Sequence, residues 1–473
     1  MKNNRLLTLI IVLLTVSIGA GYLIYQGGVK TSALILVGTV AIPLIYGVIA
    51  HPKVGILVML IAAYLIMWIM RMGLTSFPLG TLMDGLLALL ILGLFIKQKY
   101  NPDWTILKGP ISTLILIWIG YNFLEIINPS STSRMAWMYT IRSVAIVMLS
   151  YFIFSYHIRS RDFLKLIIKV WLSLSMFAAL YGFKQHHFGF FQFEEEYLNS
   201  DPLIMNLLFI GGVWRKFSIF SDPVAFSYNM VVSSLLCVGL MFGPVSRAKK
   251  WILGFMIAFF LLNMIYSGTR GAYVLFPAAM ILLSILVFNK KVLMLTALGG
   301  IIVLILINIP TSNPALFRFQ SAFKPSEDAS FNVRAINQKM IQPYIQSHPM
   351  GGGLGSTGVW GQKFSPGSFL ASFPPDSGYV RVAVELGWIG LLIFCTLIFV
   401  ILKTGINNYY KIKDPELKSY CLAMTLIVFA LNVGNYPQEA LVQFPTNVYF
   451  YLVVALINVT LRLDQENNHL LNA

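Results

Sequence analysis

The feature that most constrains this chain is a series of long apolar runs that extends from one end of its 473 residues to the other. A membrane-spanning helix needs about 20 apolar residues in succession, and fourteen runs reach or approach that length. The runs lie near residues 6–25, 31–50, 54–70, 80–96, 109–128, 137–156, 163–182, 222–243, 251–267, 271–288, 291–309, 379–402, 417–435 and 443–461. The pattern predicts an all-α polytopic membrane protein with about 14 transmembrane helices.

The composition excludes the other broad classes of protein. Charged residues make up 11% of the chain, against about 25% in soluble domains, which excludes a cytosolic enzyme. Hydrophobic residues make up 57%, which excludes intrinsic disorder. The three cysteines, Cys237, Cys395 and Cys421, lie inside apolar runs and are typical of small buried hydrophobes rather than of a disulfide scaffold. We expect the first run to remain as a span, because no small-residue cleavage site follows it.

The basic residues indicate an orientation for these spans. The chain carries a formal net charge of +16, and cytoplasmic loops of membrane proteins are enriched in Lys and Arg. If the N-terminus lies inside, every short loop on the cytoplasmic side carries Lys or Arg, as at Lys97, Lys99, Lys249 and Lys411. The sequence therefore predicts that both termini lie in the cytoplasm.

This orientation divides the chain into five parts and leaves two long loops on the outer face. The parts are 1–182 with transmembrane helices 1–7, 183–221 as the first long outer loop, 222–309 with helices 8–11, 310–378 as the second long outer loop, and 379–473 with helices 12–14 and a short cytoplasmic tail. Loops of this length are uncommon and are usually functional. We expect both to contain short helices and the second to be catalytic. Since the short cytoplasmic loops offer no Gly-rich phosphate loop, chemistry driven by cytoplasmic ATP is not expected.

A turn between two spans carries the first candidate for anion binding. In the segment 267–272, Ser-Gly-Thr-Arg-Gly-Ala, Gly268 and Gly271 permit a tight connection. Arg270 then stands at the start of the next helix, where free backbone N–H groups and the helix dipole also attract anions. A fixed guanidinium there suits a phosphate or diphosphate. The alternative is an arginine that reaches lipid head groups.

The second long loop carries a periodic stretch, which predicts a short helix from Ser330 to Gln346. Four apolar residues recur in it at helical spacing, namely Val333, Ile336, Met340 and Tyr344. Arg334, Asn337 and Gln338 share another face of that helix, so Arg334 can address the same anion as Arg270. The alternative is a solvated helix face.

Further along the same loop are two candidates for a catalytic base. His348 precedes a glycine-rich run, 351–358, which suits close backbone approach to a ligand or a flexible lid. Asp376 lies at the outer mouth of the next span, where it is either a base near the two arginines or a helix N-cap. Glu385 falls inside that span, where pairing with a nearby Arg is the favoured interpretation.

The first long loop combines histidines, acids and bases. His186, His187 and the run 194–196 of three glutamates fit no common metal-ligand spacing, so we expect an acidic solvated face and no metal. Arg215 and Lys216, near its end, add positive charge at the outer membrane boundary. Contact with phospholipid is the alternative for this pair.

Three pieces of the chain, in order, resemble the O-antigen ligase and polymerase superfamily of bacterial polysaccharide assembly. Phe217 to Ala225 resembles the family's Phe–Pro start of a span, and the 267–272 turn is similar to its Ser-Arg-Gly-Ala motif. The long outer loop then supplies Arg334, Pro349 with its glycines, a short polar motif that ends in Tyr379, and the span around Glu385. Together these pieces cover about 215–400, whereas the N-terminal half is similar only as generic membrane helices.

The resemblance implies an enzyme on the outer face of the inner membrane. It implies an inverting, metal-independent transfer, without a cofactor, of a glycan from an undecaprenyl-diphosphate carrier to an acceptor hydroxyl. Ligases use lipid A-core as the acceptor, and polymerases use another carrier-linked repeat unit. Arg270 and Arg334 would hold the diphosphate, with Arg215 adding positive charge. A chain-length regulator is a further partner, and nucleic acid is not.

This sequence departs from the family at the catalytic base. Ligases of the group have His where the short polar motif meets the span, and here Asp376 occupies that place. The departure favours polymerase over ligase, and it leaves open that His348 serves as the base.

Three other functions compete with this one. A flippase or transporter suits fourteen spans, but transporters usually show internal repeats and a midplane site, and neither is visible in the sequence. A membrane glycosyltransferase of the other type has an acidic first outer loop, whereas residues 26–30 contain no acid. A scaffold without chemistry is the remaining alternative.

Overall fold

The computed structural model describes residues 42–73, 79–100, 102–210, 212–312, 314–324 and 329–472, with short pieces of residues 14–39. Most of the span predicted at 6–25, half of the span predicted at 31–50 and most of the first outer loop at 26–30 lie outside the described residues.

Among the described residues, 12 helical segments are long and apolar enough to cross a membrane. They are α2 (Pro52–Arg71), α3 (Leu79–Tyr100), α4 (Pro110–Leu124), α5 (Arg134–Val144) with α6 (Ser150–His157), α7 (Arg161–His187), α10 (Pro223–Met241), α11 (Arg247–Tyr266), α12 (Arg270–Tyr273) with α13 (Leu275–Val287), α14 (Lys290–Asn308), α18 (Gly378–Lys411), α19 (Pro415–Gly434) and α20 (Thr446–Asn472). Each coincides with one predicted run from 54–70 onward. The prediction of an all-α polytopic membrane protein is confirmed.

Local sequence explains where several of these helices begin. The Asp222 carboxylate accepts hydrogen bonds from the backbone N–H groups of Val224 and Ala225, and Pro223 fills the first position of α10. Asp414 caps α19 in the same way, again followed by a proline. An Asp N-cap followed by Pro satisfies the free N–H groups of the first turn and fixes a helical φ.

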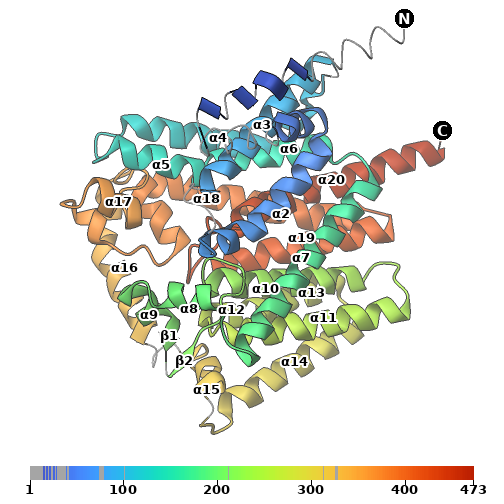
Figure 1. The fold of residues 1–473 in the computed structure, drawn as a ribbon. Coiled ribbons are helices and arrows are strands. Elements are labelled where there is room, and N and C mark those ends of the chain that lie inside the picture. The colour runs from blue at the N-terminus through green and yellow to red at the C-terminus, as the bar shows by residue number, and fades with distance from the viewer. Residues whose placement is uncertain are drawn as a thin grey trace, which may run out of the picture.

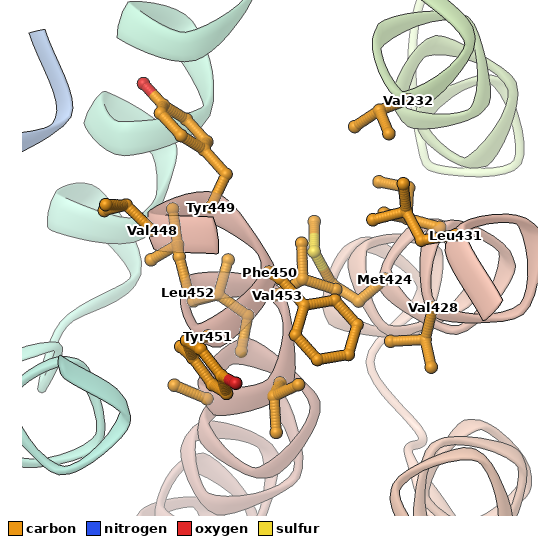
Figure 2. Packing of buried hydrophobic residues seen from close by; sticks show 14 of the residues in the cluster. Val232, Met424, Val428, Leu431, Val448, Tyr449, Phe450, Tyr451, Leu452 and Val453 are labelled. Carbon is orange, nitrogen blue, oxygen red and sulfur yellow. The ribbon is translucent and has the colours of Figure 1, made fainter. Parts of the chain in front are cut away.

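Three helices form the centre of the bundle. Figure 2 shows Val232 of α10, Met424 of α19 and Phe450 of α20 directed toward one another, and all three side chains are buried. By contrast, α14 is exposed along almost its whole length. Since lipid solvates an apolar surface, α10, α19 and α20 are the interior helices of the bundle and α14 is a peripheral one.

The long connections lie on one face of the bundle, which we call the loop face. It consists of segments 188–222, 309–377 and 435–445. The short elements α8 (Gln192–Leu198), α9 (Pro202–Leu208), α16 (Ala329–Ser347) and α17 (Gly358–Phe364) lie along the left and lower left of Figure 1. The remaining short elements of these segments are β1 (Phe209–Ile210), β2 (Val213–Trp214), α15 (Pro314–Ser321) and η5 (Phe369–Ser372). The helix predicted at 330–346 corresponds to α16, while the small β1–β2 hairpin was not predicted.

The loop face is expected to lie outside the cytoplasm, because the opposite ends of the helices carry the short basic connections. Gln346 and Asn407 are exposed at opposite ends of the bundle. We expect Gln346→Cys to react with a membrane-impermeant maleimide in intact spheroplasts and Asn407→Cys to react only after lysis. Both variants are made with the native cysteines replaced by Ala. Equal labelling of the two positions in intact spheroplasts would contradict the orientation.

Candidate functional site

Arg334 and Asp376 line the same recess on the loop face. The recess has a volume of about 190 Å³ and is lined by Arg334, Asn337, Gln338, Phe373, Pro374, Asp376, Ser377 and Val380. The three polar residues predicted to share one face of the 330–346 helix therefore do share it. Nε of Arg334 is buried and has no hydrogen-bond partner among the described residues. A buried donor with unused hydrogen-bonding capacity suits an anionic ligand.

Asp376 is exposed, and it does not cap the helix that follows. Ser377 holds the N-cap position of α18. The first backbone N–H of α18, at Gly378, donates to the carbonyl oxygen of Asn435 at 2.9 Å. The alternative that Asp376 serves as an N-cap is therefore wrong, because a neighbouring loop already satisfies this helix end.

His348 lies outside the residues that line this recess. Its Nδ1 is 3.0 Å from the carbonyl oxygen of Tyr344 and 2.9 Å from the hydroxyl of Ser347. The imidazole also stacks on the Tyr344 ring, with the ring centroids 4.0 Å apart. Of the two candidate bases, the structure brings Asp376 to Arg334.

The 267–272 turn has the predicted geometry. Gly268 adopts a left-handed φ of +61°, which favours glycine, and Arg270 is the first residue of α12. Gly271 serves a different purpose, since a Cβ at that position would lie 3.2 Å from the hydroxyl of Tyr228 and 3.2 Å from Pro437. One glycine therefore makes the turn, and the other allows it to pack against α10 and the 435–445 segment.

Two further arginines hold the turn in place. The Arg215 guanidinium donates to the Ser267 carbonyl oxygen at 3.0 Å and to the Thr269 hydroxyl at 3.0 Å. Arg318 of α15 donates to the Gly268 carbonyl oxygen at 2.5 Å.

Burial, together with the nearby charges of Arg318 and Arg270, lowers the pKa of Arg215 to about 10. We call Arg215, Arg270 and Arg318 the cationic cluster. Several like charges in one small region favour binding of an anion.

Tyr228 of α10 lies between the cationic cluster and the Arg334 recess. Its hydroxyl donates to the Gly434 carbonyl oxygen at 3.0 Å and contacts the position of Gly271. It is also close enough to Arg334 for the charge of that guanidinium to act on it. Tyr228 therefore contacts the 267–272 turn and is within reach of the charge of Arg334.

A buried ion network lies behind Asp376. Arg381 of α18 pairs with Glu439 at 2.5 Å and with Glu385 at 3.4 Å, so the predicted pairing of Glu385 with an arginine is confirmed. Burial raises the pKa of Glu439, the positive charge of Arg381 opposes that shift, and the negative charges of Glu385 and Asp376 add to it. Glu439 was not predicted as part of the site, because it lies in a short connection with no motif.

The glycine-rich run packs against a break in α18. Helical geometry is lost at Gly387, where φ is +67° and a Cβ would overlap the Pro349 carbonyl oxygen. Across the break, the N–H groups of Gly352 and Gly353 donate to carbonyl oxygens of residues 384 and 385, each at 2.9 Å. Gly352 and Gly353 therefore approach a helix backbone closely, and neither position has room for a side chain.

The first long loop departs from its prediction. Glu194 is fully buried, and its carboxylate accepts hydrogen bonds from Tyr181 at 3.0 Å and Gln185 at 2.6 Å. The expected acidic solvated face is wrong for this residue, although Glu195 and Glu196 are exposed.

The other titratable groups of this loop also make protein contacts. His186 stacks on Tyr266, with centroids 3.8 Å apart, and His187 lies 3.2 Å from the Tyr266 hydroxyl. Lys216 lies over the Phe190 ring, and burial lowers its pKa to about 8. Lipid contact was the alternative for Lys216, and its ammonium group is instead packed inside this loop.

The fold and this site define a multi-pass membrane protein with arginines and a carboxylate gathered on one face. Residues 255–395 match the family model described as O-Antigen ligase, and this stretch includes Arg270, Arg334 and Asp376. This match supports the resemblance to the O-antigen ligase and polymerase superfamily that the motifs indicated. A search of curated proteins found no match.

Proposed function

We propose that this protein transfers glycans from an undecaprenyl-diphosphate carrier to an acceptor hydroxyl on the outer face of the bacterial inner membrane. The observation that carries the proposal is the shared recess of Arg334 and Asp376, which combines an anion-binding group with a carboxylate. A lipid-linked donor also accounts for a site built at the ends of membrane-spanning helices.

The reaction assigns different tasks to these groups. The acceptor oxygen attacks the anomeric carbon of the donor sugar, and the bond from that carbon to the diphosphate oxygen breaks. The acceptor proton passes to the Asp376 carboxylate, and the carrier diphosphate leaves with the bonding electrons. General-base catalysis of this kind contributes roughly 10²–10⁴-fold to the rate.

The arginines stabilise the negative charge that develops on the leaving group. Arg334 offers a buried guanidinium donor, and Arg270 is the first residue of the span that starts with α12. Arg215 and Arg318 mainly stabilise the 267–272 turn, because each donates a hydrogen bond to a backbone carbonyl oxygen of that turn. Groups fixed before the reaction stabilise a transition state without reorganisation, so this rigid turn is suited to holding a diphosphate.

We favour polymerisation over ligation. The family resemblance associates ligases with His at the mouth of the span, and this chain has Asp376 there. A carrier-linked repeat unit is then both donor and acceptor, and a chain-length regulator is the expected partner.

A transporter is the second candidate, because the break in α18 at Gly387 is a feature that many transporters share. In transporters, carbonyl groups freed at such a break coordinate the transported ion. Here the carbonyl groups of Val384 and Glu385 accept hydrogen bonds from the glycine-rich run. This pairing favours the enzyme over the transporter.

The direct test is to incubate the purified protein with the carrier-linked repeat unit. That substrate is isolated from cells that lack the protein. We expect a ladder of carrier-linked products that differ by one unit. If lipid A-core must be added before any product forms, the protein is a ligase. If the substrate crosses the bilayer of proteoliposomes without forming a product, the transporter is correct.

Replacing either Arg270 or Arg334 by Lys should lower the rate of transfer at least about tenfold, the scale of one lost charge-assisted hydrogen bond. Lysine keeps the charge but lacks the bidentate fork of arginine. The rate is measured from product ladders. Arg134→Lys is the matched control, because Arg134 is exposed at the start of α5, does not line the Arg334 recess and is not part of the cationic cluster.

Normal turnover in both variants would contradict diphosphate binding by these arginines. Loss of expression or of a monodisperse gel-filtration peak would instead indicate that the arginines stabilise the fold.

A further inference from the structure

A second and larger recess also includes Asp376 in its lining, but not Arg334. Its volume is about 840 Å³, and it is open to solvent. The residues that line it are Gly358, Val359, Gln362, Ser372, Phe373, Pro374, Pro375, Asp376, Gln438, Glu439 and Gln443. They come from α17, from the 365–377 segment and from the connection between α19 and α20. We call this hollow the amide recess.

Three glutamine side chains give the amide recess its chemistry. Gln362, Gln438 and Gln443 all line it, and none of their side-chain amides makes a hydrogen bond within the part of the chain that the structure describes. Each amide can donate two hydrogen bonds and accept two. A ligand rich in hydroxyl or acetamido groups can pair with donors and acceptors of this kind.

The charges that border the two recesses differ in sign. No Lys or Arg lines the amide recess, whereas Asp376 and Glu439 both do. The smaller recess, which Asp376 also lines, has Arg334 as its second charged residue. The amide recess therefore does not suit a diphosphate, and its carboxylates disfavour a sugar acid.

We propose that the amide recess is the acceptor subsite and that it binds an uncharged sugar through Gln362, Gln438 and Gln443. This inference rests on the proposed transferase function. The acceptor hydroxyl then reaches Asp376 from the amide side, while the carrier diphosphate is held on the arginine side. Phe373, Pro374 and Asp376 line both recesses, and Asp376 is the titratable residue among the three. A base that acts between nucleophile and leaving group needs such a position.

The element that carries Gln362 is fixed by aromatic packing. In α17, Trp360 and Phe364 stack on Tyr139 of α5, with ring centroids 4.7 and 5.3 Å apart. Gln362 lies between them in sequence and is exposed. A binding side chain on a rigid element loses less conformational freedom when a ligand binds.

Two probes separate the acceptor subsite from the carrier site. One is undecaprenyl diphosphate without sugar. The other is the water-soluble oligosaccharide that mild acid releases from the carrier-linked repeat unit. In the double variant Gln362→Ala, Gln443→Ala, we expect inhibition of transfer by the oligosaccharide to weaken about tenfold, since two hydrogen bonds are lost. Binding of undecaprenyl diphosphate should stay within about twofold of wild type.

Two control variants sharpen this comparison. Gln346→Ala removes an exposed amide of the loop face that lines neither recess, and it should change neither measurement. Arg334→Lys should show the reverse pattern, with weaker binding of undecaprenyl diphosphate and unchanged inhibition by the oligosaccharide.

Cysteine protection supplies a readout that does not depend on turnover. In the background without native cysteines, Gln362→Cys should react with a maleimide, and the oligosaccharide should slow that reaction at least about threefold, as expected for a site that is two-thirds occupied. Gln346→Cys should react at the same rate with or without the oligosaccharide.

The outcomes separate the two proposals. If wild type transfers glycan and the double variant responds to both probes as wild type does, the acceptor subsite is wrong and the transferase function stands. If the double variant binds neither probe, the glutamines stabilise the fold, and the proposal of an acceptor subsite is again wrong. If wild type neither transfers glycan nor binds either probe, the transferase function fails, and the acceptor subsite fails with it.

Discussion

Asp376→Asn should abolish glycan transfer while the protein stays folded and still binds undecaprenyl diphosphate. The substitution keeps the shape of the side chain and removes the group that accepts the proton. The side chain is exposed and does not hold the N-cap position of α18, which Ser377 occupies. Its loss therefore costs the fold little. Transfer is read from product ladders, and binding is read from the quenching of tryptophan fluorescence.

His348→Ala has to be measured in parallel, because His348 is the rival base. We expect it to retain most of the activity, since Nδ1 of His348 already contacts the Tyr344 carbonyl and the Ser347 hydroxyl. Asp376→His should restore part of the activity, as the resemblance to ligases implies. An inactive His348→Ala beside an active Asp376→Asn would make His348 the base.

Gly387→Ala should have the largest effect on the fold, with loss of most of the folded protein and of all transfer. Its φ of +67° costs a residue with a side chain about 1–3 kcal/mol. The added Cβ would also overlap the Pro349 carbonyl oxygen, which adds strain from overpacking. The glycine-rich run would have to move away from α18, and with it the segment that leads to Asp376. The measurement is the melting temperature in detergent, by fluorescence-detected gel filtration.

Gly300→Ala is the matched control. Gly300 lies in α14 with open space around its Cβ position, so alanine should be neutral or slightly stabilising there. A Gly387→Ala protein that melts and turns over like wild type would show that the break in α18 is not needed for either property.

The spans could be predicted because their cause is local. A helix that crosses the bilayer must be apolar over a fixed length, and every described span follows from such a run. The break in α18 could not be predicted in this way, because Gly387 sits in an apolar run like any other. What breaks the helix is contact with Pro349 and Gly351, which belong to a loop.

The candidate site was predicted only where one short segment carried the signal. Arg270 follows from its turn, Arg334 from helical periodicity, and Asp376 from its position before a span. Arg318 and Glu439 could not be found, because their partners are distant in sequence: Arg318 donates to Gly268 and Glu439 pairs with Arg381.

Burial of a polar group is equally hard to predict from a local run. Glu194 sits in a run of three glutamates and was expected to face water. Tyr181 and Gln185 of α7, which hold it in the interior, belong to a different element of the chain.

The contacts of the glycine-rich run also determine which segment of this protein can be exchanged with the matching segment of a relative. That run touches the N-terminal half directly: Asn128 donates to the Met350 carbonyl oxygen at 3.0 Å, and a Cβ at Gly353 would lie 2.6 Å from Ser131. From α4, Tyr121 donates to the Leu386 carbonyl oxygen beside the break at 2.8 Å. A chimera that transplants only residues 255–395 would separate them from this support. A graft that keeps this support therefore has to carry residues 121–131 as well.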